Sequence, residues 1–149
     1  MSRPTVFDTN AMLTILLSHA SSQFVSSHPR TKHVSRRAVD ELRKLFESVD
    51  VRLSLPVLVE VDYFLTKPTW MRRKVVASMQ VLSRTFPVVD AEVAEVLAVD
   101  DYLVAELGVV DVSLIAAADY GVVVVTDDAR LASEIAKRGG PVLPTPDPS

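Results

Sequence analysis

Cysteine is absent from the 149 residues of the chain. This excludes disulfide bonds and thiolate metal sites, so any metal ion would have oxygen or histidine ligands. No stretch approaches the roughly 20 apolar residues that a membrane-spanning helix needs, and the first eight residues lack the apolar core of a signal peptide. We therefore expect a soluble cytoplasmic protein.

Hydrophobic residues make up 48% of the chain and charged residues 23%, which is typical of a folded domain rather than a disordered segment. The length suits a single domain with a sizeable core. We expect this domain to span residues 1–143 and to be followed by a Pro-rich tail at residues 144–149.

The net charge of −3 is unevenly distributed along the chain. Residues 28–74 hold 11 Lys/Arg and 6 Asp/Glu, a net charge of +5, whereas the rest of the chain holds 5 and 13, a net charge of −8. Such asymmetry can place a basic surface beside an acidic site. Ordinary solvated helix faces explain the same distribution equally well, so charge alone does not indicate the function.

Apolar residues recur with the period of strands in some segments and with the period of helices in others. The expected strands are residues 5–7, 51–55, 122–125 and 142–143, and the expected helices are residues 11–18, 34–49, 56–67, 70–86, 90–108, 111–120 and 129–138, with a loop at 18–32. This alternation predicts an α/β fold with a central parallel sheet that helices cover on both faces. Ligands of such sheets bind beyond the carboxyl ends of the strands.

Acidic residues follow two of the expected strands. Asp8 comes directly after the first strand, and Asp127 and Asp128 follow the strand at 122–125, so all three reach the same edge of the sheet. Asp111 begins a helix, where the helix dipole favours a carboxylate. Taken one at a time, Asp8, Asp111 and Asp128 are well explained as helix N-caps.

Glu60 lies inside an apolar helical segment, where a charge needs an exposed face, an ion pair or a function. Asp62, two residues further on, points to a different side of the helix. Explaining each acid separately does not explain why several acids share one edge of the sheet without a basic residue in their motifs. Crowded carboxylates raise one another's pKa unless a cation lies among them, and oxygen ligands favour Mg²⁺ or Mn²⁺.

The segments around these acids resemble the motifs of the PIN-domain family, which includes the VapC toxins of toxin–antitoxin pairs. The four segments are Val-Phe-Asp-Thr-Asn at 6–10, Leu-Val-Glu-Val at 58–61, Asp-Val-Ser-Leu-Ile-Ala-Ala-Ala at 111–118 and Val-Thr-Asp-Asp at 125–128. Their order and spacing agree with the family from Val6 to Leu143. The resemblance implies a three-layer α/β/α sandwich, Mg²⁺- or Mn²⁺-dependent endoribonuclease activity and, often, a homodimer.

The resemblance also implies a role for each residue of these motifs. Asp8 and Asp111 would be the main metal ligands, and Glu60 and Asp128 would complete an acidic catalytic pocket, with Asp128 also facing the metal. The family pattern of threonine, a variable residue and an acid selects Asp128 rather than Asp127 as the fourth acid.

Two polar residues and one neighbouring acid would support this pocket. Asn10 and Thr126 match the positions that support the acids, and Asp127 would be a secondary contact or face solvent. The three histidines lie in or near a loop without ligand spacing, so we assign them no role. The candidate RNA contacts are Arg36, Arg37, Arg72 and Arg73, together with Arg30, Lys32 and Lys74, although any one of them could be a solvated helix residue.

Three other functions fit the sequence less well. A haloacid-dehalogenase-like phosphatase also has an aspartate after its first strand, but it needs a second aspartate two residues later, where this chain has Asn10. A response-regulator receiver domain needs an acidic pair near the first strand and a late lysine, and neither is evident. A PIN-like scaffold would bind RNA or protein without cutting, but the presence of all four acids favours an enzyme. Among enzymes, a toxin with an adjacent antitoxin and an RNA-processing nuclease without one both stay open, and the compact size favours the toxin.

Overall fold

The protein is built around a four-stranded parallel sheet, seen in a computed structural model that describes residues 3–65, 69–89 and 101–146. The strands are β1 (Pro4–Phe7), β2 (Asp50–Val51), β3 (Val123–Val125) and β4 (Val142–Leu143), in the order β2-β1-β3-β4. All neighbouring pairs are parallel, and the register places Phe7 opposite Val125. The predicted α/β fold with a central parallel sheet is confirmed.

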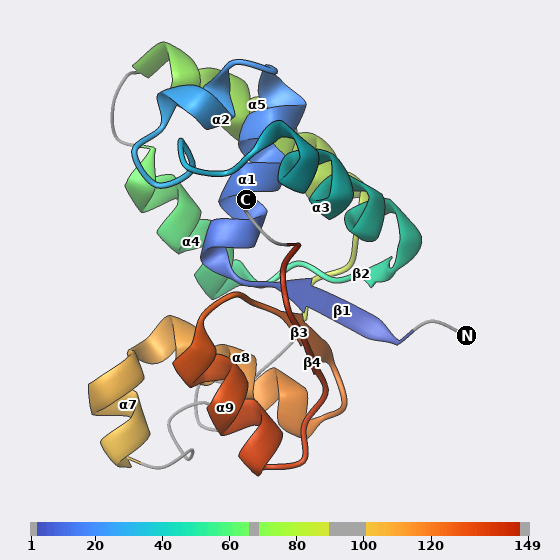
Figure 1. Ribbon diagram of the computed structural model, residues 1–149, viewed down its shortest axis with the longest axis vertical. Helices are drawn as coiled ribbons and strands as arrows, with labels where there is room; N and C mark the ends of the chain where they lie inside the picture. Colours follow the sequence, from blue (N-terminus) through green and yellow to red (C-terminus); the bar gives the residue numbers. More distant parts are fainter. Residues whose placement is uncertain (1–2, 66–68, 90–100, 147–149) are drawn as a thin grey trace.

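Helices lie on both sides of the sheet (Figure 1). On one side are α1 (Thr9–Ala20), α2 (Phe24–Ser27), α3 (Arg36–Ser48), α4 (Leu55–Phe64) and α5 (Thr69–Thr85), and on the other are α7 (Asp101–Leu107), α8 (Val109–Asp119) and α9 (Ala129–Lys137). The strongly apolar helices α1 and α8 are buried along most of their length. They bring buried side chains such as Leu13 and Ile115 to the core, where each contributes about 1.5–3 kcal/mol.

Strand β3 is an uninterrupted run of valines because helices cover both of its faces. All three of its residues are buried. Gly121 precedes it with a φ of 84°, a conformation that glycine adopts without steric cost and that ends α8. The residues after Val125 therefore lie at the carboxyl edge of the sheet.

The chain between α1 and α4 differs from the prediction in two places. The expected loop at 18–32 contains the short helix α2, whose Phe24 and Val25 are buried. The expected strand at 51–55 is only two residues long, with an isolated bridge between Leu53 and Val88. Leu55 begins α4 instead of ending the strand, because the Ser54 hydroxyl accepts a hydrogen bond from the Val57 amide and caps the helix.

Helix α8 begins two residues before the predicted start at Asp111. Its N-cap is Gly108, with a φ of 87°, and Asp111 lies in the first turn rather than at the cap. The helix dipole still favours a carboxylate at this position. Of the helix expected at 90–108, α7 lies within the described residues and residues 90–100 lie outside them.

The described part of the predicted Pro-rich tail, residues 144–146, packs partly on the domain. Thr145 and Pro146 are half-buried, and residues 147–149 lie outside the described part of the chain. The amide of Thr126 donates to the Leu143 carbonyl over 3.0 Å, which ties β4 to the end of β3. The tail therefore passes near the carboxyl edge of the sheet.

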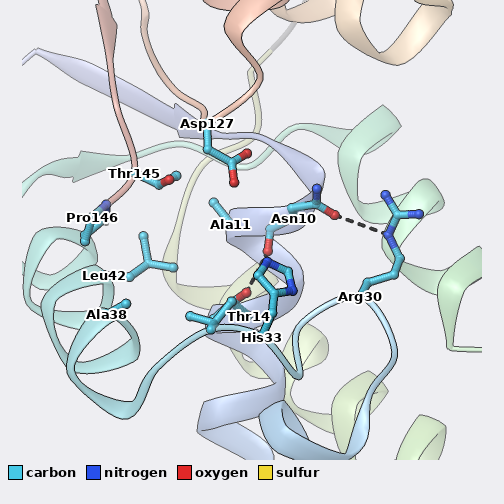
Figure 2. A pocket seen from close by; sticks show the side chains of 11 residues that line it. Asn10, Ala11, Thr14, Arg30, His33, Ala38, Leu42, Asp127, Thr145 and Pro146 are labelled. Carbon is cyan, nitrogen blue, oxygen red and sulfur yellow. Dashed lines mark hydrogen bonds between the residues drawn. The ribbon is translucent and has the colours of Figure 1, made fainter. Parts of the chain in front are cut away.

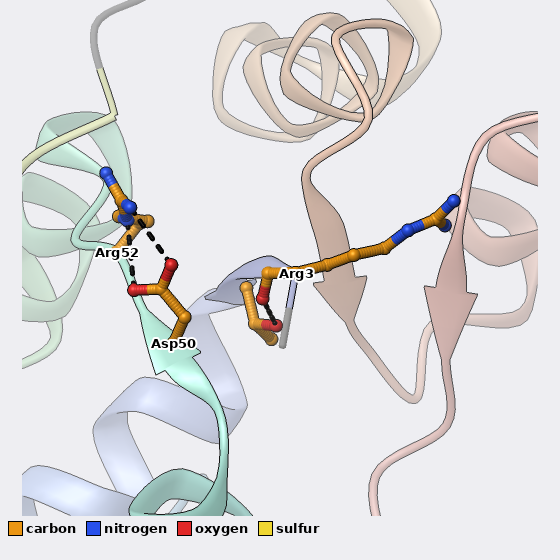
Figure 3. A network of polar contacts seen from close by, with 4 residues as sticks. Arg3, Asp50 and Arg52 are labelled. Carbon is orange, nitrogen blue, oxygen red and sulfur yellow. Dashed lines mark hydrogen bonds and ion pairs between the residues drawn. The ribbon is translucent and has the colours of Figure 1, made fainter. Parts of the chain in front are cut away.

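The amino end of the sheet carries a separate polar network (Figure 3). Two guanidinium nitrogens of Arg52 donate to the two carboxylate oxygens of Asp50 over 3.2 and 3.0 Å, and Arg3 extends away from this pair. Since solvent reaches about one-third of each side chain, it screens the pair, which therefore contributes little to stability. No helix among the described residues is both long enough and apolar enough to span a membrane.

Candidate active site

Asp8 is fixed at the point where β1 passes into α1. Its amide donates to the Val125 carbonyl over 2.9 Å, which continues the pairing between β1 and β3 by one residue. Its Oδ1 accepts from the Ala11 amide over 2.9 Å, so Asp8 is the N-cap of α1. Its Oδ2 accepts from the Thr126 hydroxyl over 2.6 Å. With both oxygens bonded and 6% of its surface exposed, this carboxyl group has little freedom to move.

The pKa of Asp8 is raised from its ordinary value of 3.8 to about 6. Burial is the main cause, and the hydrogen bonds from Thr126 and Ala11 oppose it. The charges of Asp127 and Asp128 raise the pKa further. Asp8 has no ion pair with any described basic residue, so above pH 6 its charge is buried without a compensating cation.

Asp111, in the first turn of α8, is half-buried and also has a pKa raised to about 6. Burial is again the largest cause, followed by the charges of Asp128, Glu60 and Asp8. These four acids come from the end of β1, from α4, from α8 and from the start of α9. The fold therefore brings all four predicted acids within electrostatic reach of Asp111, and we call them the acidic cluster.

Asp127 and Asp128 are adjacent in sequence but contact different parts of the protein. Oδ1 of Asp128 accepts from the amides of Arg130 and Leu131 over 2.9 and 3.1 Å, so Asp128 caps α9 as an aspartate before a helix is expected to do. Asp128 raises the pKa of both Asp8 and Asp111. The exposed Asp127 lines a pocket on the Asn10 side of Asp8 (Figure 2).

Glu60 lies half-exposed on α4, at the border of an apolar groove. The groove is lined by Leu55, Pro56, Val59, Tyr63, Val109 and Val110 in addition to Glu60. Asp62 lies on another side of the same helix, where it forms an ion pair of 2.8 Å with Arg72. The two acids thus have different neighbours, as their spacing predicted, and the charge of Glu60 is the one that raises the pKa of Asp111.

The donor chemistry of the acidic cluster suits Mg²⁺ or Mn²⁺, which prefer oxygen ligands. Among residues 3–65, 69–89 and 101–146, no three His, Asp or Glu side chains lie close enough together to hold one metal ion. Mg²⁺ does not need such a cage, because it usually keeps several waters and takes one or two protein carboxylates. Asp8 and Asp111, which have raised pKa values and no ion pair with a described basic residue, could be these one or two carboxylates.

Thr126 and Asn10, which were predicted to support the acids, have different hydrogen-bond partners. The Thr126 hydroxyl contacts two acids, because it donates to Asp8 and accepts from the Asp128 amide over 3.0 Å. Within the described part of the chain no hydrogen bond joins the Asn10 side chain to an acid; its Oδ1 accepts from Nε of Arg30 over 3.2 Å.

Of the five arginines predicted as RNA contacts, Arg30 lines the pocket that also contains Asn10 and Asp127, and the other four do not. Arg37 pairs with Glu41 over 3.1 Å, and Arg72 pairs with Asp62. Arg36 lines a separate pocket between α1 and α3, and Arg73 is exposed on α5.

One residue with no role in the sequence-based account, His28, is buried and organises the loop that carries Arg30. Its ring nitrogens contact the Phe64 carbonyl and the Arg30 amide. The sequence gives no periodic signal for this arrangement, because the partners lie 36 and 2 residues away.

A comparison of the chain with models of known protein families and with curated proteins found no match.

Proposed function

We propose that the chain is a PIN-like endoribonuclease that hydrolyses RNA phosphodiester bonds with Mg²⁺ or Mn²⁺ at the acidic cluster. The observation that carries this proposal is the raised pKa of Asp111, caused by burial and by three acids from other segments. No described basic residue pairs with any member of the cluster. Clusters of uncompensated carboxylates reduce stability, so they are typical of functional sites.

Each acid has a part that follows from its position. Asp8 is rigid because both of its oxygens are hydrogen-bonded, and it would hold the metal in a fixed place. Asp111 is less buried and would be the second ligand. Asp128 uses Oδ1 to cap α9, which leaves Oδ2 for the metal or its water, and Glu60 would complete the pocket. A bound divalent ion would neutralise charge on the phosphate and lower the pKa of a water molecule.

The reaction is the attack of a water oxygen on phosphorus. A new P–O bond forms, the bond to the leaving oxygen breaks, the proton of the water passes to solvent or to a carboxylate, and the leaving oxygen takes up a proton from solvent. The ribose 2′-hydroxyl takes no part in this reaction. The products therefore carry a simple phosphate at the cleaved end and no 2′,3′-cyclic phosphate.

A homodimer is part of the proposal because α4 exposes an apolar strip. Leu55, Val59 and Tyr63 recur every four residues and are 61%, 62% and 71% exposed, and Val109 at the start of α8 is 54% exposed. Contiguous exposed apolar residues of this kind mark protein interfaces. A toxin would also bind an antitoxin, and a gene for a small partner protein directly beside this one would favour the toxin over an RNA-processing nuclease.

The test is the cleavage of single-stranded RNA by the purified chain. End-labelled RNA should be cut in Mg²⁺ or Mn²⁺, left intact in excess EDTA, and cut again when the metal is restored. RNA with 2′-O-methyl riboses should also be cut, since the 2′-hydroxyl is not the nucleophile. Full activity in EDTA, or products that end in cyclic phosphate, would contradict the proposal. Binding without cleavage would favour the scaffold function instead.

A further inference from the structure

A small pocket lies between α1, the loop before α3, α3 itself and the tail (Figure 2). Its polar lining consists of Asn10, Thr14, Arg30, His33, Asp127 and Thr145. Ala11, whose amide donates to Oδ1 of Asp8 over 2.9 Å, also lines the pocket, so the pocket adjoins the acidic cluster. Arg30 is the one arginine or lysine that lines it among the described residues.

Three hydrogen bonds hold the loop that carries Arg30. Nδ1 of His28 accepts from the Arg30 amide over 3.1 Å, so the ring proton lies on Nε2, which donates to the Phe64 carbonyl over 2.9 Å. The buried Thr31 hydroxyl donates to the Val25 carbonyl over 2.7 Å. The backbone at Arg30 is therefore fixed before any ligand binds.

The Arg30 side chain is fixed as well. Its guanidinium carbon lies 3.8 Å from the centre of the Phe64 ring, and its Nε donates to Oδ1 of Asn10. These contacts leave the two terminal nitrogens without a partner in the part of the chain that the structure describes. A planar guanidinium held in this way is suited to bind two oxygens of one phosphate.

We propose that Arg30, at the edge of this pocket, binds the RNA phosphate adjacent to the one being hydrolysed. The inference rests on the proposed nuclease function, because it names how the same site holds its substrate. The acidic cluster repels a polyanion, so the substrate needs a cation placed beside the cluster and not neutralised by it. Arg37 and Arg72 are poorer candidates because Glu41 and Asp62 already pair with them.

The test is the binding of a labelled, random-sequence single-stranded RNA decamer, measured by fluorescence anisotropy in Ca²⁺ with the RNA recovered intact. Arg30→Gln should weaken binding roughly tenfold or more, as expected for a charge-assisted contact. The slope of log K against log salt should become shallower by about 0.7, the value for one phosphate contact on a single strand. The control is Arg84→Gln, which removes an exposed arginine outside the pocket, at the end of α5, and should change affinity less than twofold.

Two further variants separate geometry from charge. Arg30→Lys should keep the salt slope but bind several-fold more weakly, because an ammonium group lacks the planar fork. If Arg30→Gln does not unfold cooperatively, Arg30→Lys serves as the test in its place. Phe64→Leu should weaken binding at an unchanged net charge, because the guanidinium loses the ring on which it lies.

The outcomes distinguish this inference from the nuclease proposal. Unchanged affinity and slope in Arg30→Gln, an equal loss in Arg84→Gln, or no RNA binding by the unmodified chain would each overturn the role of Arg30. Binding that depends on Arg30 in a chain that cuts no RNA in Mg²⁺ would support this role and contradict the proposed catalysis.

Discussion

The hydroxyl of Thr126 donates a 2.6 Å hydrogen bond to Oδ2 of Asp8, a residue 118 positions earlier in the chain. The same hydroxyl accepts from the amide of Asp128 over 3.0 Å. One buried threonine thus orients an acid at the end of β1 and the backbone of an acid at the start of α9. This bond also lowers the pKa of Asp8 relative to what burial alone would produce.

Replacing Thr126 by valine should destabilise the protein. The change keeps the shape of the side chain but leaves a buried carboxylate oxygen of Asp8 without its donor, which costs about 1–3 kcal/mol in the free energy of unfolding. Urea unfolding at pH 7.5 measures the loss. Thr126→Ser keeps the hydroxyl and should retain most of the stability, so equal stability of the two variants would contradict the role of the bond.

The metal-free protein should lose stability as the pH rises from 4 to 6. The pKa values of Asp8 and Asp111 are about 6 in the folded protein and 3.8 as ordinary values, so between these pH values the native state binds more protons than the unfolded state. The penalty is fully present above pH 6 and disappears below pH 4. For Asp8 alone, a shift of about two pH units corresponds to about 3 kcal/mol.

Asp8→Asn tests the origin of this pH dependence. In EDTA at pH 7.5 the variant should be more stable than the unmodified protein, and its stability should fall less between pH 4 and 6. Asp62→Asn removes an acid that Arg72 already pairs, so its pH dependence should resemble that of the unmodified protein. A less stable Asp8→Asn at pH 7.5 would show that burial of this charge carries no penalty.

Mg²⁺ should raise the melting temperature at pH 7.5. An ion that binds only the native state adds about 2.7 kcal/mol at 100 times its dissociation constant. At pH 5 the gain should shrink, because Asp8 and Asp111 are then mostly protonated and protons compete with the ion. Differential scanning calorimetry with and without Mg²⁺ measures this, and an equal gain in Asp111→Asn would place the ion elsewhere.

Asp128→Asn should reduce cleavage far more than Asp127→Asn. Asparagine also caps helices well, so the first variant should keep α9 and lose only the charge that Asp128 contributes beside Asp111. Asp127 is exposed and lies in the neighbouring pocket. Initial rates on one RNA, with melting curves of both variants, give the comparison, and equal or reversed effects would move the fourth acid by one residue.

The position of the acids could be predicted because it depends on local rules. Parallel strands end at a common edge, so the acids after residues 5–7 and 122–125 had to lie near each other. Asp128 precedes a helix and caps it for the reason that aspartate commonly does.

The surroundings of Arg30 could not be predicted in the same way. Its partners Asn10 and Phe64 lie 20 and 34 residues away, and no periodic pattern links them. The start of α8 was misplaced because Gly108, in a left-handed conformation, takes the cap position and leaves Asp111 in the first turn. The short helix α2 was missed because its serines resemble a loop, while Phe24 and Val25 reach the core.

The most direct test of the account compares two aspartates of the same helix. Asp111→Asn, in the first turn of α8, and Asp119→Asn, at its end and paired with Arg138 over 2.6 Å, each remove one negative charge. Cleavage of single-stranded RNA in Mg²⁺ at pH 7.5 should fall at least about a hundredfold in Asp111→Asn and stay within about twofold in Asp119→Asn, with both proteins folded. Undiminished cleavage by Asp111→Asn would contradict the central claim that the acidic cluster is the catalytic site.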